Sequence, residues 1–272
     1  MANWSYKAEK FDTIIKKMEK IMSKVVLVTG ATSGFGRETV KMFAKDGCKI
    51  IAIGRREERL KELKEELNEC DIHTISLDVR DKKEVFLAIE NLPLEYRNID
   101  ILVNSAGLAL GLEKAPDALL EDWEVMIDTN IKGLLYITKA VTPIMVKRKS
   151  GYIFNIGSIA GNWPYEGANV YGSTKAFVQQ FSLNLRTDLK GTNIRVSNIE
   201  PGFSKTEFSN VRFKGDDKKA NAIYDGIQPL VGEDIANLIF TLSKLPLHVN
   251  VNTLEVMPTA QTWAGFALER DC

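Results

Sequence analysis

A phenol and an ammonium group stand four residues apart at Tyr171 and Lys175, a spacing that puts both on one face of a helix. A free phenol has a pKa near ~10, and adjacent positive charge lowers it, so Tyr171 is a candidate general acid and base. Ser158 comes thirteen residues earlier and would hydrogen-bond a substrate oxygen on which charge develops. The two histidines, His73 and His248, are far apart and lack a ligand pattern, so we assign proton transfer to the tyrosine.

Asn130 is a further candidate for this chemistry. It follows Asp128 and Thr129 inside a segment that we expect to be one long helix. Its amide has two interpretations: it joins Lys175 to a water molecule in a proton relay, or it bonds to the backbone of a kinked helix. The residues alone leave both interpretations open.

A glycine-rich turn follows the first expected strand and opens a helix. Residues 29–36 read Thr-Gly-Ala-Thr-Ser-Gly-Phe-Gly. Glycines permit a tight turn and a close approach of ligand to backbone, and a helix N-terminus offers free N–H groups to a pyrophosphate. A plain glycine-rich turn is the alternative, because the spacing GxxxGxG differs from the commoner GxGxxG. We expect dinucleotide contacts at Gly30, Thr32, Ser33, Gly34, Phe35 and Gly36.

The residues after the second expected strand select the dinucleotide. Folds that prefer NAD carry an acid there, about 20 residues past the glycines, whereas this chain has Arg55 and Arg56. Two guanidinium groups can pair with a 2′-phosphate, so we expect NADP(H); the alternative is a solvated start of the next helix. The turns after the third and fourth strands are expected to border the adenosine through Asp78, Val79, Asn104, Ala106 and Gly107.

Short β-branched runs alternate with helical stretches from Lys24 onward. The expected strands are 25–29, 50–53, 73–77, 100–104, 152–156, 194–199 and 253–257. Because parallel strands need crossover helices, this order predicts an α/β fold over 24–272: a single doubly wound Rossmann-type domain with a seven-stranded parallel sheet flanked by helices. Ligands bind such sheets at the carboxyl ends of the strands, so the irregular segment 201–225 is expected to be a lid.

The composition excludes several classes of protein. The 272 residues include 36 basic and 36 acidic side chains, so no charge excess indicates nucleic acid, and no apolar run is long enough to span a membrane. Three cysteines without a CxxC pair favour a reducing, cytoplasmic location and no metal site.

Residues 1–23 are predicted to form an amphipathic helical extension, since Phe11, Ile14, Ile15, Met18 and Met22 recur at helical spacing. That helix would dock on the domain or on a neighbouring subunit.

Together these motifs resemble the short-chain dehydrogenase/reductase family over about residues 24–258. The resemblance rests on TGxxxGxG at 29–36, the Asn-Ser-Ala-Gly turn at 104–107, Asn130, Ser158, the Tyr171-xxx-Lys175 pair and Pro201-Gly202. It implies that Tyr171 is the acid and base, Ser158 the partner of the substrate oxygen, Lys175 a ribose ligand that modulates the tyrosine, and Asn130 the anchor of a proton relay. Ser105 departs from the usual Asn-Asn-Ala-Gly motif. Further cofactor contacts are implied at Pro201, Gly202, Phe203 and Thr206.

Four longer stretches, 100–111, 155–165, 199–217 and 252–258, are similar to the NADP-dependent 3-hydroxy acid dehydrogenases that act on serine, allo-threonine and 3-hydroxypropionate. This similarity implies hydride transfer between NADP(H) and a small 3-hydroxy acid or its semialdehyde or ketone, and a homotetramer. A small acid needs a cation, and among Lys205, Arg212 and Lys214 of the lid we favour Arg212. The candidate substrate contacts are Ser158, Trp163, Asn169, Phe208 and Arg212, although lid cations and loop aromatics often serve solvation or packing.

Two other functions remain open from the sequence. The same chemistry could reduce a different carbonyl compound, namely a sulfonated or other small acid aldehyde, an acyl thioester or a bulky ketone. A protein that binds NADP(H) as a sensor without catalysis is the second, and the intact Ser158, Tyr171 and Lys175 argue against it.

Overall fold

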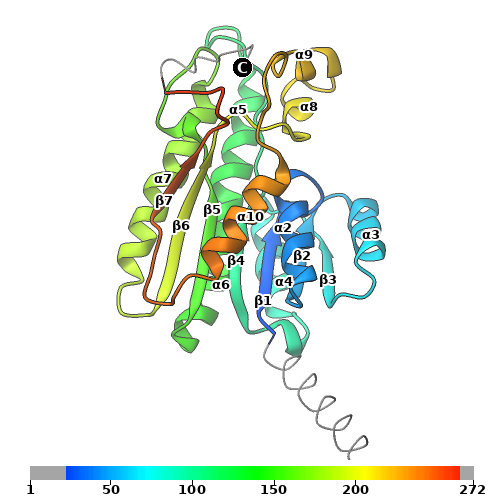
Figure 1. Ribbon diagram of the computed structural model, residues 1–272, viewed down its shortest axis with the longest axis vertical. Helices are drawn as coiled ribbons and strands as arrows, with labels where there is room; N and C mark the ends of the chain where they lie inside the picture. Colours follow the sequence, from blue (N-terminus) through cyan, green and yellow to red (C-terminus); the bar gives the residue numbers. More distant parts are fainter. Residues whose placement is uncertain (1–22, 264–272) are drawn as a thin grey trace, which may run out of the picture.

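The computed structural model describes residues 23–263, and it contains the predicted sheet with helices on both faces (Figure 1). Every neighbouring pair of strands is parallel, in the order β3-β2-β1-β4-β5-β6-β7, which confirms the predicted fold class. The strands are β1 (Val25–Thr29), β2 (Lys49–Gly54), β3 (Ile72–Ser76), β4 (Ile99–Asn104), β5 (Gly151–Ile156), β6 (Ile194–Pro201) and β7 (Thr253–Val256). Residues 1–22 of the predicted N-terminal helix lie outside the described residues.

Apolar side chains on both faces of the sheet hold the helices in two layers. One core contains residues of α2 (Gly34–Lys45), α3 (Glu57–Glu66) and α10 (Gly232–Ser243). The other contains residues of α4 (Lys82–Glu90), α6 (Leu134–Arg148) and α7 (Asn169–Asp188). The central strands are rich in Val, Ile and Leu because both of their faces are buried. In β1, for example, every residue is buried.

The predicted long helix after β4 is divided into two. Helix α5 (Leu120–Ile127) is followed by a π-helical stretch, Asp128–Gly133, which leads into α6. One residue more per turn shifts the side chains relative to a continuous α-helix, and such insertions occur frequently at functional sites. Asn130 lies in this stretch and is almost completely buried.

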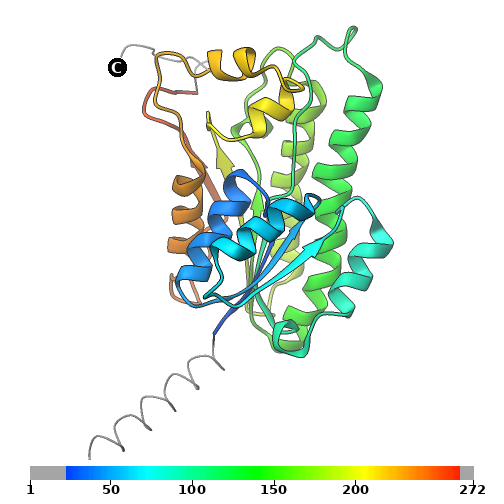
Figure 2. The ribbon, with the colours of Figure 1, turned by 90° about the vertical axis from the view of Figure 1, so that its right-hand side faces the viewer.

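The lid predicted at 201–225 lies beyond the carboxyl ends of the strands (Figure 2). It contains two short helices, α8 (Phe208–Arg212) and α9 (Asp217–Ala222), which are too short to show a periodic pattern in the sequence. The hydroxyl of Tyr224 lies 2.5 Å from the hydroxyl of Ser209 and donates a hydrogen bond to the carbonyl of Ser204 at 2.7 Å. These bonds tie the end of the lid to its beginning.

Within residues 23–263, no helix has the length and apolar character needed to cross a bilayer. In the same part of the chain, no group of three or more His, Cys, Asp or Glu side chains is arranged to hold a metal ion.

Candidate active site

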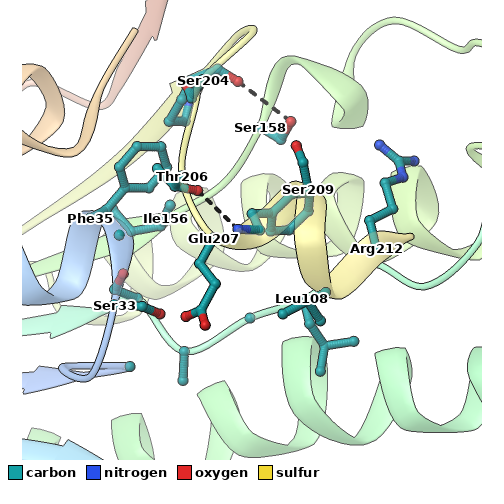
Figure 3. A pocket seen from close by; sticks show the side chains of 18 of the residues that line it. Ser33, Phe35, Leu108, Ile156, Ser158, Ser204, Thr206, Glu207, Ser209 and Arg212 are labelled. Atoms are coloured by element: carbon teal, nitrogen blue, oxygen red, sulfur yellow. Dashed lines mark hydrogen bonds between the residues drawn. The ribbon is translucent and has the colours of Figure 1, made fainter. Parts of the chain in front are cut away.

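A cavity of about 510 Å³ lies between the carboxyl ends of the strands and the lid (Figure 3). It extends from the glycine turn after β1 to Tyr171 on α7. Its volume is in the range of small-molecule and cofactor sites. The topology places this cavity where the doubly wound fold was expected to bind its ligand.

The glycine turn has the geometry of a pyrophosphate site. Gly30 and Gly34 adopt φ values of +69° and +50°, which favour glycine. A Cβ at Gly36 would lie 2.3 Å from the carbonyl oxygen of Gly30, so close packing of helix on turn requires glycine there. The N-cap of α2, Ser33, forms no capping hydrogen bond through its side chain, which leaves the N-terminal N–H groups for an anion. Thr32, Ser33, Gly34 and Phe35 line the cavity, whereas Gly36 acts through packing.

Arg55 and Arg56 reach the cavity at the end of β2, as predicted. The Arg55 side chain is 53% exposed and lies 3.9 Å from Asp78. Arg56 donates hydrogen bonds to the hydroxyls of Thr32 and Ser33 at 3.0 and 2.9 Å. Two guanidinium groups beside the glycine turn suit the 2′-phosphate of NADP(H), so the residues present fit this cofactor.

The turns after β3 and β4 supply the next wall of the cavity. Asp78, Val79, Ala106 and Gly107 line it. The hydroxyl of Thr29 accepts hydrogen bonds from the N–H groups of Ser105 and Ala106, so the ends of β1 and β4 are held together.

Asn104 is not among the residues that line the cavity, and its predicted contact with the adenosine stays a prediction. It is buried, and its amide donates to Thr138 and Asn155 at 3.0 and 2.9 Å. The physical reason is its position at the last residue of β4, where the side chain points between neighbouring elements of the core.

Tyr171 and Lys175 lie one turn apart on α7, and both are buried at the floor of the cavity. The Lys175 Nζ atom is 5.9 Å from the centre of the Tyr171 ring and donates a 2.8 Å hydrogen bond to the carbonyl of Ile156. A hydrogen bond to the backbone thus holds the ammonium group near the phenol ring. The ammonium group has further N–H donors for ribose hydroxyls.

Burial is the largest influence on the pKa of both groups. It raises the pKa of Tyr171, with Tyr165 adding to the effect, whereas a hydrogen bond with Ser158 and the charge of Arg212 oppose it. Burial also lowers the pKa of Lys175 to about 8. Ser158 and Arg212 therefore favour the phenolate, and the expected effect of Lys175 on the pKa of Tyr171 stays a prediction.

Ser158 lies at the N-cap of a single 3₁₀ turn, Ile159–Gly161, directly after β5. Its Oγ atom accepts a hydrogen bond from the Ala160 N–H at 3.1 Å and is 3.5 Å from the carbonyl of Pro201. The hydroxyl is fixed at the cavity wall beside Tyr171. Pro201, Gly202, Phe203 and Thr206 continue this wall from β6 into the lid.

The Asn130 side chain contacts the backbone. Its Oδ1 accepts from Leu108 N–H at 2.9 Å, and its Nδ2 donates to the Leu108 carbonyl and to the Thr174 hydroxyl. A Cβ at Gly107 would lie 3.3 Å from Asn130 Oδ1 and 3.6 Å from Lys175 Nζ, so Gly107 separates the two side chains. The amide thus forms bonds to the backbone, and the relay through a water molecule to Lys175 stays a prediction. Asn130 orients the 107–108 segment that lines the cavity.

Arg212 places a cation from the lid close to Tyr171. Its guanidinium carbon lies 5.4 Å from the centre of the Tyr171 ring, and its Nη2 donates a 2.6 Å hydrogen bond to the hydroxyl of Tyr165. Phe208 covers the same phenol, with ring centres 5.5 Å apart. Of the other two lid cations, Lys214 pairs with Asp122 at 2.7 Å, and Lys205 lies 5.9 Å from the ring of Tyr224. Neither of these lysines lines the cavity.

Trp163 and Asn169 are not among the residues that line the cavity, so the structure gives no support to their predicted contacts with the substrate. Trp163 is 40% exposed, and its indole N–H lies 3.4 Å from a carboxylate oxygen of Glu255 on β7. The Asn169 amide donates to the carbonyl of Glu113 at 3.0 Å. The Trp163 side chain thus contacts β7 and the Asn169 side chain contacts the backbone at Glu113, and their distance in sequence from Tyr171 does not reveal either contact.

Several cavity residues were missed from the sequence, among them Thr129, Glu207 and Tyr224. Thr129 has a buried hydroxyl without a hydrogen-bond partner in the described part of the chain. Glu207 and Tyr224 belong to the lid. The only signal for them was membership of the segment 201–225, because an irregular segment does not show which side chains point inward.

Known proteins are similar to this chain in both sequence and fold. The short chain dehydrogenase family profile matches residues 24–217. The NADP-dependent 3-hydroxy acid dehydrogenase YdfG of Escherichia coli K12 is 58% identical over 247 residues, which cover 90% of this chain and 99% of the relative. Sulfoacetaldehyde reductase 2 of Chromohalobacter salexigens is 54% identical over 252 residues, covering 92% of this chain and all of the relative.

A solved structure, the closed form of a serine dehydrogenase complexed with NADP⁺, superposes with a TM-score of 0.87 at 57% identity and covers 90% of this chain and 99% of that one. The serine dehydrogenase of Escherichia coli superposes with a TM-score of 0.78 at 52% identity, covering 88% and 99%. The predicted family resemblance is confirmed: the chain belongs to the short-chain dehydrogenase/reductase family.

Proposed function

We propose that this protein transfers a hydride between NADP(H) and a small 3-hydroxy acid, of the serine, allo-threonine or 3-hydroxypropionate type. The relatives confirm the predicted cofactor and reaction class, since their described activities are NADP-dependent 3-hydroxy acid dehydrogenase and serine dehydrogenase. The observation that carries the substrate assignment is the guanidinium of Arg212, 5.4 Å from the Tyr171 ring in a cavity that also contains Ser158.

The nicotinamide ring of NADP(H), when bound, accepts or supplies the hydride. For the cofactor we assign the glycine turn to the pyrophosphate, Arg55 and Arg56 to the 2′-phosphate, and Lys175 to the ribose hydroxyls. Lys175 suits this role because its buried ammonium group has one backbone acceptor and N–H donors to spare.

The acid–base chemistry is assigned to Tyr171 and Ser158. In the oxidation, the phenolate of Tyr171 takes the proton of the substrate hydroxyl while the carbinol carbon loses its hydride, and the product is a carbonyl compound. In the reduction, the phenol returns that proton to the carbonyl oxygen. The Ser158 hydroxyl donates a hydrogen bond to the same oxygen as charge develops on it. Arg212 binds the acid group and favours the phenolate through its charge.

A direct assay tests this function. We expect reduction of NADP⁺, followed by the absorbance of the reduced nicotinamide, with L-serine, L-allo-threonine or 3-hydroxypropionate. NAD⁺ should be a much poorer acceptor, and Tyr171→Phe should abolish the signal. Lack of turnover with all three acids in an enzyme that binds NADPH would contradict the substrate assignment.

One relative favours a second substrate class, because sulfoacetaldehyde reductase 2 is 54% identical over nearly the whole chain. A guanidinium group binds a sulfonate as readily as a carboxylate. Oxidation of NADPH with sulfoacetaldehyde, at a kcat/KM above that for the hydroxy acids, would make the sulfonated aldehyde the better assignment.

We further propose a cytoplasmic homotetramer. Leu119 and Leu120 at the start of α5 are 55% and 60% exposed, and Ile127 at its end is also exposed. Apolar side chains grouped on one helix are typical of subunit interfaces. Light scattering coupled to size exclusion should give the mass of four chains, and the mass of one chain would contradict the proposal.

A further inference from the structure

An ion-pair cluster connects the lid to the start of α3, beside the expected 2′-phosphate site. Both carboxylate oxygens of Glu207 accept hydrogen bonds from Arg56 Nη1, at 2.9 and 2.8 Å. One of them also accepts from Arg59 Nη1 at 2.7 Å. Glu207 lies immediately before α8, and its carboxylate points toward Ser33 of the glycine turn (Figure 3).

The donors of Arg56 are fully used in this arrangement. A guanidinium group has five N–H bonds. Those of Arg56 are directed at the Thr32 hydroxyl from Nε and Nη2, at the Ser33 hydroxyl from Nη2, and at the two oxygens of Glu207 from Nη1. A phosphate can therefore bind Arg56 only if one of these partners leaves.

Glu207 is the partner that a phosphate would displace. Burial raises its pKa, but the hydrogen bonds from Arg59 and Arg56 outweigh this and hold the pKa below its ordinary value, so the carboxylate is charged. A 2′-phosphate beside it would add like charge, whereas the hydroxyls of Thr32 and Ser33 are neutral. The side chain of Glu207 is 29% exposed, so it can turn toward water when a phosphate replaces it on the guanidinium groups.

We propose that Glu207 is an internal substitute for the 2′-phosphate. Without cofactor it binds Arg56 and Arg59, and when NADP(H) binds, the 2′-phosphate takes both guanidinium groups and the carboxylate withdraws. Arg59 thereby becomes a third basic ligand of the phosphate, beside Arg55 and Arg56. This inference rests on the NADP(H) specificity of the proposed function.

The exchange also links the two ends of the cavity. Glu207 is followed directly by α8, which holds Phe208 and Arg212 against Tyr171. Thr206, on its other side, packs on the glycine turn, with 3.3 Å between its Cβ and a Cβ built at Gly34. Release of Glu207 frees the lid from the adenosine end, so the presence of a 2′-phosphate is transmitted to the residues that contact the substrate.

Two nucleotides that lack the nicotinamide test the exchange: 2′,5′-ADP, which carries the 2′-phosphate, and 5′-ADP, which does not. By calorimetry on the full-length chain, Glu207→Gln should bind 2′,5′-ADP about fivefold more tightly than the wild type, as expected for removing a partly exposed competing ion pair. Its affinity for 5′-ADP should stay unchanged. Arg59→Gln should weaken 2′,5′-ADP about tenfold and leave 5′-ADP unaffected.

Glu166→Gln is the matched control, because Glu166 lines the same cavity but pairs with Lys114. It should bind both nucleotides like the wild type. Weaker or unchanged binding of 2′,5′-ADP to Glu207→Gln would overturn the exchange, as would an equal gain for 5′-ADP. No substrate takes part in this experiment, so its result is independent of the hydroxy-acid assignment. If the wild type bound 2′,5′-ADP no more tightly than 5′-ADP, the NADP(H) specificity itself would be contradicted.

Limited trypsin digestion tests the link to the lid, which contains Lys205, Arg212 and Lys214. Cleavage within 203–225 should accelerate when 2′,5′-ADP binds the wild type, and it should already be fast in Glu207→Gln without ligand. Cleavage that 2′,5′-ADP does not change, at a concentration that saturates the protein, would overturn the coupling.

Discussion

If Arg212 binds the acid group of the substrate, its replacement should affect acids and spare uncharged alcohols. The guanidinium uses one Nη2 donor on Tyr165 and Nε on the Gly111 carbonyl, and among the described residues its Nη1 donates to none. A carboxylate can therefore take two charge-assisted hydrogen bonds. Losing such contacts costs about 1.5 to 3 kcal/mol, or about 10- to 150-fold in kcat/KM.

The assay compares two substrates that differ only in the acid group, 3-hydroxypropionate and 1,3-propanediol. Arg212→Gln should lower kcat/KM for 3-hydroxypropionate by that factor and change it little for the diol. Arg212→Lys should fall between, because it keeps the charge but loses the bidentate geometry. Lys214→Gln serves as the control, since Lys214 is two residues away and pairs with Asp122 outside the cavity.

Two results would refute this reasoning. Equal losses for the acid and the diol would mean that Arg212 acts on the Tyr171 proton or on lid structure, not on the carboxylate. A loss in Lys214→Gln as large as in Arg212→Gln would mean that general positive charge on the lid, and not a specific contact, attracts the acid.

Three further perturbations follow from the site. Tyr171→Phe should lower kcat by at least about 10²-fold with NADP⁺ affinity retained, as measured by turnover and by titration calorimetry. Lys175→Met should stabilise the cofactor-free protein. Burial lowers the pKa of Lys175 from 10.5 to about 8, so the buried ammonium group lowers the free energy of unfolding by about 3 kcal/mol below pH 8. This loss of stability shrinks as the pH rises from 8 to 10.5. Urea unfolding should thus show a larger gain at pH 7 than at pH 10, and equal gains would contradict the burial of charge. Gly36→Ala should abolish NADP⁺ binding and lower Tm, because its Cβ would lie 2.3 Å from the Gly30 oxygen. The control is Gly191→Ala, where the added Cβ meets nothing within 4 Å and φ is +83°, so about 1 kcal/mol of backbone strain is expected with binding intact.

The sheet was predictable because its signal is local. Each of the seven strands is a short β-branched run, and a buried parallel strand needs no partner-specific pattern to be recognised. The boundary between α5 and α6 was not predictable, since the π-helical stretch at Asp128–Gly133 differs from an α-helix by hydrogen-bond register and not by residue type. The two short lid helices likewise lack enough turns for a periodic pattern.

The site residues likewise include some that local spacing predicts and some that it does not. Tyr171 and Lys175 are four residues apart on one helix, and the glycine turn is a contiguous motif, so spacing alone brings these groups together. The direction in which a loop side chain points depends on distant partners. Trp163 turns toward Glu255, 92 residues later in the chain, and no local pattern reports such a pairing.

If Arg212 binds the acid group of the substrate, its position in the lid has a mechanistic consequence. Tyr171, Lys175 and Ser158 belong to the rigid sheet and its covering helix, whereas Arg212 belongs to the lid. The charge of Arg212 opposes the rise in the pKa of Tyr171, so the lid position that holds the acid is also the one that favours the phenolate. An alcohol without an acid group can still reach the catalytic groups, but it contributes nothing to keeping the guanidinium over the phenol. Under this proposal, recognition of the acid and activation of Tyr171 are two effects of one lid residue.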